Sequence, residues 1–401
     1  MLKFKARISI GKFCAQTGIL LLMPLLLVYM TNAIGGEAHS TGPLQVGIAV
    51  VAVMLIAIIV RNGPIGINPF VLMAGLLCGV MLCVCVACNE LSLYLCLPYM
   101  LKFFLWLLVY IIGYLAVKRF SCEKYMVTVM CFAYLVMIGI FFSSLYADYS
   151  IKNKNYVITA VYYILCCMPF LFEVKNHRTR NVFLAILAVG VIMSFKRSAL
   201  LVFACVILVL AISNLKKAQR KRVVNVLIVG CILFIAGVIC LTTVAQNNTT
   251  LSNILGIWTR RFWEGNSRNT IQREVIRMFF DSNVINIVFG HGYDAVLQES
   301  IFNLSAHNDY LEILYDYGIV GFLLYAGIIV NLLKVAKSIG GDNSDRRNGY
   351  ITSLTIFLVA SIPSHMLTYS TYFLIISLYW GFAHGLAAKE QLCIKEDIKC
   401  A

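Results

Sequence analysis

His307 is the side chain in this sequence that is best suited to proton transfer, because it lies in a short polar stretch, 305–309, just before an apolar helix-forming run. Histidine exchanges protons near neutral pH, since its ordinary pKa is about 6.5, and it can act as a general base for a hydroxyl nucleophile. A lone histidine at a helix start is more often structural, so both roles stay open for this residue by itself. Among the other histidines, His291 and His365 could line the same outer cavity.

A tight turn at Lys196 and Arg197 is the first place where an anion could bind. The two charges interrupt a hydrophobic stretch, 182–212, between two predicted membrane spans. An arginine at membrane depth costs at least about 2.5 kcal/mol, so such residues usually face a cavity, a partner charge or an anionic ligand. Arg197 is therefore a candidate for anion binding at the outer leaflet. The equal alternative is a snorkelling side chain that contacts lipid headgroups.

A second basic group lies in a long hydrophilic segment further along the chain. Its arginines are Arg260, Arg261, Arg268, Arg273 and Arg277. After Ser267, a predicted N-cap, the apolar residues of 271–279 recur on one helical face, whereas Arg273 and Arg277 fall on the opposite face. The same helical phase puts Arg268 inside the apolar arc, so we expect it to point toward the membrane spans. A solvated face that binds anionic lipid is the simpler interpretation for Arg277, and it is open for Arg273.

The elements that carry these residues follow from the composition. Hydrophobic residues make up 61% of the 401 residues, charged residues 13%, and the mean hydropathy is +0.85, which excludes a soluble domain of this length. The continuous apolar runs lack the alternation of barrel strands, so the fold is expected to be all-α. The net charge of +15 is spread through short loops, which indicates membrane orientation and argues against nucleic-acid binding. The cysteines at 83, 85 and 88 lie in an aliphatic run without a nearby histidine, so we expect helix packing there and no metal.

The apolar runs predict a polytopic membrane protein of about twelve transmembrane helices. They lie near 13–34, 44–60, 67–88, 97–117, 125–146, 155–172, 181–195, 198–213, 223–245, 317–333, 350–368 and 371–388. We expect three parts: spans one to nine in 1–245, one large external loop with amphipathic helices in 246–316, and spans ten to twelve with a cytoplasmic tail in 317–401. Most lysines and arginines outside that loop fall on the side of the basic N-terminus, which predicts cytoplasmic termini.

Three groups of residues resemble the O-antigen ligase and O-antigen polymerase superfamily of bacterial surface-polysaccharide assembly. The block 305–312, followed by 317–321, is similar to the family's His-Asn-x-Tyr-Leu block that leads into a Gly-x-x-Gly span. The helix beginning at 266–268 and the turn 289–293 resemble its Ser-Gly-Arg helix and Gly-x-Gly turn. The turn 194–199 is similar to its Ser-Arg-Gly or Ser-Arg-Ser turn. Two residues depart from the family pattern: Asn266 before Arg268, and Lys196 beside Arg197. They leave open which arginine of the loop has the functional role.

The resemblance implies a glycosyltransferase that moves a glycan from undecaprenyl pyrophosphate to an acceptor hydroxyl at the outer leaflet of the bacterial cytoplasmic (inner) membrane. It implies a reaction without a metal, a nucleotide sugar or another cofactor. It also implies that the configuration at the anomeric carbon is inverted and that His307 is the catalytic base. Arg197 and Arg268 are the pyrophosphate-binding candidates, because arginine carries a permanent, planar positive charge. The supporting candidates are Arg260, Arg261, Arg273, Asn308 and Tyr310.

Several functions stay open at this point. Within glycan transfer, a repeat-unit polymerase of O-antigen or capsule is favoured, and a ligase that transfers glycan to lipid A core or another acceptor is the alternative. The expected partners are the lipid-linked oligosaccharide donor, the glycan acceptor and membrane lipids. A lipid-linked oligosaccharide flippase or transporter could share the number of spans, but we expect no large external loop after its ninth span. A non-catalytic lipid-binding scaffold would account for the basic loop alone.

Overall fold

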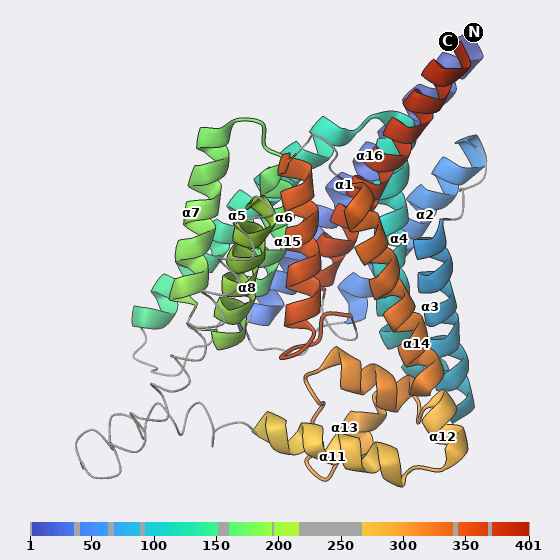
Figure 1. The fold of residues 1–401 in the computed structure, drawn as a ribbon, viewed down its shortest axis with the longest axis vertical. Helices are drawn as coiled ribbons and strands as arrows, with labels where there is room; N and C mark the ends of the chain where they lie inside the picture. Colours follow the sequence, from blue (N-terminus) through green and yellow to red (C-terminus); the bar gives the residue numbers. More distant parts are fainter. Residues whose placement is uncertain are drawn as a thin grey trace.

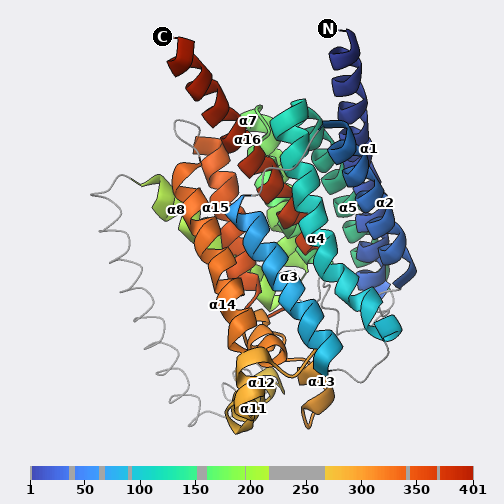
Figure 2. The ribbon, with the colours of Figure 1, turned by 90° about the vertical axis from the view of Figure 1, so that its right-hand side faces the viewer.

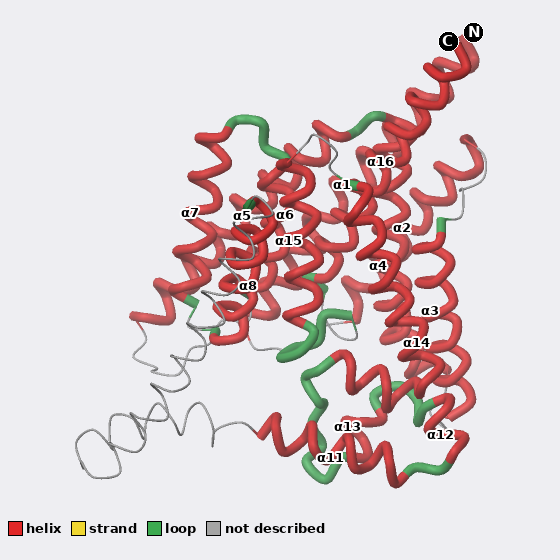
Figure 3. The backbone as a smooth tube through the Cα atoms, viewed as in Figure 1, coloured by secondary structure: helices red, strands yellow, loops and turns green. Residues whose placement is uncertain are grey.

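The computed structural model describes residues 2–35, 41–62, 68–88, 93–150, 160–194, 196–215, 267–339, 344–367 and 371–400. All regular secondary structure in these ranges is helical, with no strand among them (Figures 1 and 3). The all-α expectation is therefore confirmed. The predicted ninth span, 223–245, and the first part of the predicted external loop lie outside the described residues.

The helices follow the predicted apolar runs along the chain. They are α1 (Leu2–Gly35), α2 (Thr41–Asn62), α3 (Pro69–Cys88), α4 (Leu93–Phe120), α5 (Glu123–Ser150), α6 (Val161–Phe172), α7 (His177–Met193), α8 (Arg197–Asn214), α11 (Ser267–Asp281), α12 (Val284–Phe289), α13 (Ala295–Glu299), α14 (Asp309–Ser338), α15 (Ser344–Ala360) and α16 (Phe373–Cys400). Among the described residues, 5 helices are long and apolar enough to cross a membrane: Ile10–Asn32, Pro69–Cys88, Glu123–Leu145, Arg197–Asn214 and Asp309–Ser338. The chain is accordingly a multi-pass membrane protein.

The short helices α11, α12 and α13 lie across one end of the bundle. The N-terminal end of α1 and the C-terminal end of α16 lie at the opposite end (Figures 1 and 2). The long helix α14 joins the two regions, because its first turns contact α11, α12 and α13 while its remainder packs along α3. The start of α14 is thus the point where the covering helices meet the bundle.

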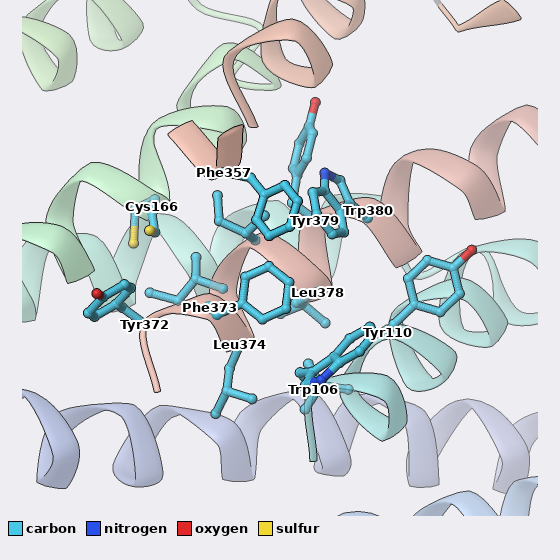
Figure 4. Close-up of a cluster of buried hydrophobic side chains, with 14 of the residues drawn as sticks. Trp106, Tyr110, Cys166, Phe357, Tyr372, Phe373, Leu374, Leu378, Tyr379 and Trp380 are labelled. Carbon is cyan, nitrogen blue, oxygen red and sulfur yellow. The ribbon is translucent and has the colours of Figure 1, made fainter. Parts of the chain in front are cut away.

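The centre of the bundle is aromatic and closely packed around α4 and α16 (Figure 4). The rings of Trp106, Phe373 and Trp380 form edge-on contacts with centroid separations of 5.5 Å. The two helices approach so closely that a Cβ on Gly381 would lie 2.2 Å from the carbonyl oxygen of Tyr110. Small residues at such crossings are typical of membrane helices, whose association depends on close packing.

His384, in the last helix, is held inside this core. One ring nitrogen lies 2.7 Å from the hydroxyl of Tyr110 and the other lies 2.8 Å from that of Tyr350. Both nitrogens therefore have hydrogen-bond partners within the helix bundle, which favours a structural role for this histidine.

Candidate active site

Helix α11 packs one face against the start of α14 and presents the other to the outside. Ile271 and Val275 are buried in a small core with Ala306 and Tyr315, whereas Arg273 and Arg277 are exposed. Arg268, on the inward side, donates a hydrogen bond of 2.9 Å from Nη1 to the carbonyl oxygen of Pro363. The side chain therefore points toward the loop between α15 and α16, on the side that the helical phase predicts.

A sharp turn at residues 290–292 is docked against a kink in α14. Gly318 has φ 65° and ψ −170°, which interrupts the helix. The amides of His291 and Gly292 donate to the carbonyl oxygens of Tyr315 (3.2 Å) and Asp316 (2.9 Å), just before the kink. Only glycine fits at this contact, because a Cβ on Gly318 would lie 2.4 Å from the carbonyl oxygen of Val288.

His291 has a structural part in the same turn. Its ring stacks on Tyr315 with a centroid separation of 4.2 Å and an interplanar angle of 7°. Its Nε2 lies 2.7 Å from the hydroxyl of Ser282, and its Nδ1 lies 3.3 Å from a carboxylate oxygen of Glu299. The imidazole is therefore engaged on its face and at both ring nitrogens.

The first turn of α14 is capped by Asn308, whose side-chain oxygen accepts hydrogen bonds from the amides of Tyr310 (3.0 Å) and Leu311 (3.3 Å). The hydroxyl of Tyr310 donates to the carbonyl oxygen of Leu358 (3.1 Å). Both supporting candidates thus make contacts that hold the start of α14 in place.

Asp309 fastens the loop 361–367 to this turn. Its carboxylate is fully buried, and one oxygen accepts hydrogen bonds from the hydroxyl of Ser361 (2.9 Å) and the amides of Met366 (2.7 Å) and Leu367 (2.9 Å). Hydrogen bonds to a charged acceptor contribute about 1.5–3 kcal/mol each, so this one side chain contributes strongly to the position of the loop.

His307 lies next to His365 from the same loop. The backbone of His307 is left-handed, with φ 51°, and its half-buried ring lies 4.8 Å from that of His365 between centroids, at 50°. His365 is itself bracketed, because its Nδ1 lies 2.9 Å from a carboxylate oxygen of Glu312 and its Nε2 lies 3.0 Å from the hydroxyl of Ser305. A carboxylate and two imidazoles therefore lie in sequence at the start of α14.

The environment of His307 favours its neutral form. Burial, followed by the positive charges of His365 and Arg268, lowers the pKa of His307 to about 4. Burial and the charge of Arg268 likewise lower the pKa of Lys196 to about 8. These shared influences show that Lys196, Arg268 and His307 belong to one electrostatic neighbourhood. At pH 7 it contains a neutral imidazole, able to accept a proton, beside two cationic side chains.

The turn before α8 contributes Lys196 to this neighbourhood. Lys196 is partly buried at the N-cap of α8, whereas Arg197, the first residue of the helix, is exposed. The sequence predicts Arg197 as the anion-binding residue of this turn, and Lys196 departs from the family pattern. The signal that could have identified Lys196 was the second charge itself. The pyrophosphate role of Arg197 stays a prediction.

Two tyrosines that the sequence did not single out connect this turn to the loop of His365. The hydroxyl of Tyr162 donates to Ser198 Oγ (2.6 Å), and its ring stacks on Tyr372 at a centroid separation of 5.1 Å. The hydroxyl of Tyr372 donates to the carbonyl oxygen of His365 (2.9 Å). The turn before α8 and the loop of His365 are thereby connected through Tyr162 of α6 and Tyr372.

The remaining candidates are three arginines. Arg260 and Arg261 lie outside the described residues, and Arg273 is exposed on the outer face of α11. Within the described ranges, no three histidine, cysteine, aspartate or glutamate side chains are arranged to hold a metal ion.

Comparison with known proteins agrees with the motifs. Residues 182–326 match the family described as O-antigen ligase. No curated protein matches the chain. The family match supports a general function in glycan ligation or polymerisation, with lipid-linked glycan and acceptor substrates. It confirms the resemblance to the O-antigen ligase and O-antigen polymerase superfamily over the segment that carries Lys196, Arg268 and His307.

Proposed function

We propose that this protein is a glycosyltransferase that moves a glycan from undecaprenyl pyrophosphate to an acceptor hydroxyl at the outer leaflet, and that it acts as a repeat-unit polymerase of O-antigen or capsule. The observation that carries the proposal is the neutral, half-buried His307 beside the cationic side chains of Arg268 and Lys196. A proton acceptor and an anion-binding group are the two functions that this transfer requires. The alternative acceptor is lipid A core or another molecule, which would make the protein a ligase.

The cations would act on the leaving group. When the bond between the anomeric carbon and the pyrophosphate oxygen breaks, negative charge develops on the pyrophosphate, and fixed positive charges lower the energy of that transition state. Arg268 offers a planar fork and Lys196 a compact point charge. Arg197, one residue beyond Lys196 and exposed, is proposed as a contact at the rim of the site for the outer part of the pyrophosphate.

His307 would act on the acceptor. Its neutral imidazole takes the proton of the acceptor hydroxyl while the oxygen bonds to the anomeric carbon and the pyrophosphate leaves with the electron pair of the broken bond. Attack from the face opposite the leaving group inverts the anomeric configuration. The positive charge needed at the leaving group comes from the basic side chains, so the proposed reaction uses no metal or cofactor.

The proposal includes a topology of twelve spans in the bacterial inner membrane, with both termini in the cytoplasm and 246–316 outside. This topology is supported by the position of α11, α12 and α13, which lie at the end of the bundle opposite the two termini of the chain. A cysteine in place of exposed Arg277 should react with an impermeant maleimide on intact cells, after the reactivity of the parent chain is subtracted. A cysteine in place of exposed His177 should not, and the reverse pattern would overturn the topology.

The activity is tested with purified protein in vesicles that contain a lipid-pyrophosphate-linked oligosaccharide donor and acceptor. His307→Ala and Arg268→Ala should each reduce transfer at least 100-fold, the lower range for loss of a general base or of an electrostatic contact. Arg277→Ala is the matched control, since its exposed side chain lies 3.9 Å from Asp281 on the outer face of α11. Transfer that persists in the His307 variant would refute the assignment.

Deletion of the protein in cells separates the two acceptors. If it is a polymerase, the surface glycan should carry single repeat units on gels. If it is a ligase, unmodified core should appear together with accumulated lipid-linked polymer.

A further inference from the structure

We propose that His365, paired with Glu312, is a positioning residue for His307 that holds the ring of the base and keeps it unprotonated until the donor binds. The inference rests on the proposed function, because it concerns the base of that reaction. Its basis is geometric: the ring of buried His365 lies 4.8 Å from that of His307 between centroids, and its Nδ1 lies 2.9 Å from a carboxylate oxygen of Glu312.

His365 is fixed from four directions. Its side chain is buried, its two ring nitrogens lie against Glu312 and Ser305, and its carbonyl oxygen accepts from Tyr372. The amides of the next two residues donate to Asp309. A histidine on a connecting loop does not need this many attachments for packing alone, and a charged ring placed 4.8 Å from another imidazole acts on that imidazole electrically.

The surrounding charges give His365 and His307 opposite protonation states. Burial alone would lower the pKa of His365, but the carboxylate of Glu312, together with those of Asp309 and Asp294, raises it above the usual range. Around His307, burial is followed by the positive charges of His365, Arg268 and Lys196, which outweigh the opposing charge of Glu312, so its pKa falls. The carboxylates therefore favour the cationic form of His365, whereas the surroundings of His307 favour its neutral form.

The division has a consequence for the order of events. In the empty site His307 is a weak base, because the three neighbouring cations oppose its protonation. A bound pyrophosphate supplies negative charge next to Arg268 and Lys196, which offsets that repulsion and strengthens the base only when the donor is present. His307 would then accept the acceptor proton with the leaving group already in place.

The test compares His365→Gln and Glu312→Gln with the parent protein. In the parent, kcat/KM for the donor should stay constant as the pH falls and should decline only near the pKa of His307 in the free enzyme, about 4. Removal of the cation at 365 should move this acid limb upward by about one pH unit, the lower range for a neighbouring charge. Glu312→Gln should move it in the same direction by less, because a raising influence on His307 is lost together with the cation.

A second measurement does not depend on turnover. Diethyl pyrocarbonate modifies neutral imidazole, so the pH at which the peptide containing His307 is half-modified, read by mass spectrometry, reports its protonation directly. Exposed His177 in the same chain is the internal reference. The midpoint for His307 should rise by the same amount as the acid limb in both variants.

His291→Gln is the matched control, because it removes a histidine from a second histidine–carboxylate pair, 3.3 Å from Glu299 in the turn 290–292. It should leave the labelling midpoint of His307 unchanged. An unchanged midpoint in both His365→Gln and Glu312→Gln would overturn the inference, as would an equal loss of activity at every pH without a shift. If His365→Gln does not fold, the labelling of Glu312→Gln decides. Full activity of His307→Ala would instead refute the proposed function and leave the labelling result to stand by itself.

Discussion

The kink at Gly318 can be tested by the smallest available change, Gly318→Ala. The backbone there has φ 65° and ψ −170°, a conformation that is essentially restricted to glycine and that costs a residue with a Cβ about 1–3 kcal/mol. The added methyl would also lie 2.4 Å from the carbonyl oxygen of Val288 and 2.6 Å from the amide nitrogen of Gly290, both backbone atoms of the docked turn. Neither atom can move without moving the turn itself.

The expected magnitude follows from what that movement breaks. The turn is attached to α14 by the hydrogen bonds from His291 and Gly292 to the carbonyl oxygens of Tyr315 and Asp316. Each contributes about 1 kcal/mol, so together with the backbone strain the substitution should destabilise the protein by about 3–5 kcal/mol. The kink also sets the direction of the first turns of α14, which begin at Asp309 beside His307. Glycan transfer should therefore fall as well.

The assay is thermal unfolding in detergent together with transfer in vesicles. Gly327→Ala is the control on the same helix, since its added Cβ would lie 3.5 Å from the side chain of Met73, an ordinary van der Waals contact. Gly318→Ala should unfold several degrees lower than the parent, whereas Gly327→Ala should differ little. Equal unfolding temperatures and equal activity for the two variants would refute the reasoning that the turn and the kink require each other.

Two further predictions concern the groups around His307. Lys196→Met should raise the KM for the lipid-linked donor about tenfold, since a contact to a charged group contributes about 1.5–3 kcal/mol, and Arg197→Met should raise it less. A larger effect at Arg197 would show that the exposed arginine, and not the partly buried lysine, makes the main contact with the donor. Asp309→Asn should speed hydrogen exchange of the amides in 361–367 and lower transfer at least tenfold, because the charged oxygen that accepts from Ser361, Met366 and Leu367 becomes part of a neutral amide. Unchanged exchange would show that the loop is held by other contacts.

Local patterns predicted the features that depend on neighbours along the chain. The length and continuity of the apolar runs predicted an all-helical membrane protein, since backbone groups in lipid must be satisfied within each segment. The spacing of 3.6 residues per turn placed Arg268 on the inward side of α11, where it contacts Pro363. The glycines of 289–293 indicated a tight turn, and the turn is present. The count of twelve spans stays a prediction.

Other features depended on contacts between distant segments. Lys196 precedes α8 as its N-cap with an extended backbone, so the helical period does not place it, and the packing of the turn decides that Lys196 is more buried than Arg197. Asn308 caps α14 and Tyr310 joins it to Leu358 of α15, contacts that the sequence does not predict; their supporting role at the substrate stays a prediction. His365 was one of several histidines that could line the cavity.

By itself, the sequence determined the helical membrane fold, the resemblance of the segment 182–326 to the O-antigen ligase family and the histidine and arginines that are candidates for the chemistry. Only the tertiary structure decided what surrounds His307. Asp309 holds a loop from beyond α15 against the start of α14, and this contact places His365 beside His307 and against Glu312 of α14. The physical reason is that a charge acts through distance in space, and the distance between two loops is fixed by the packing of the helices that carry them.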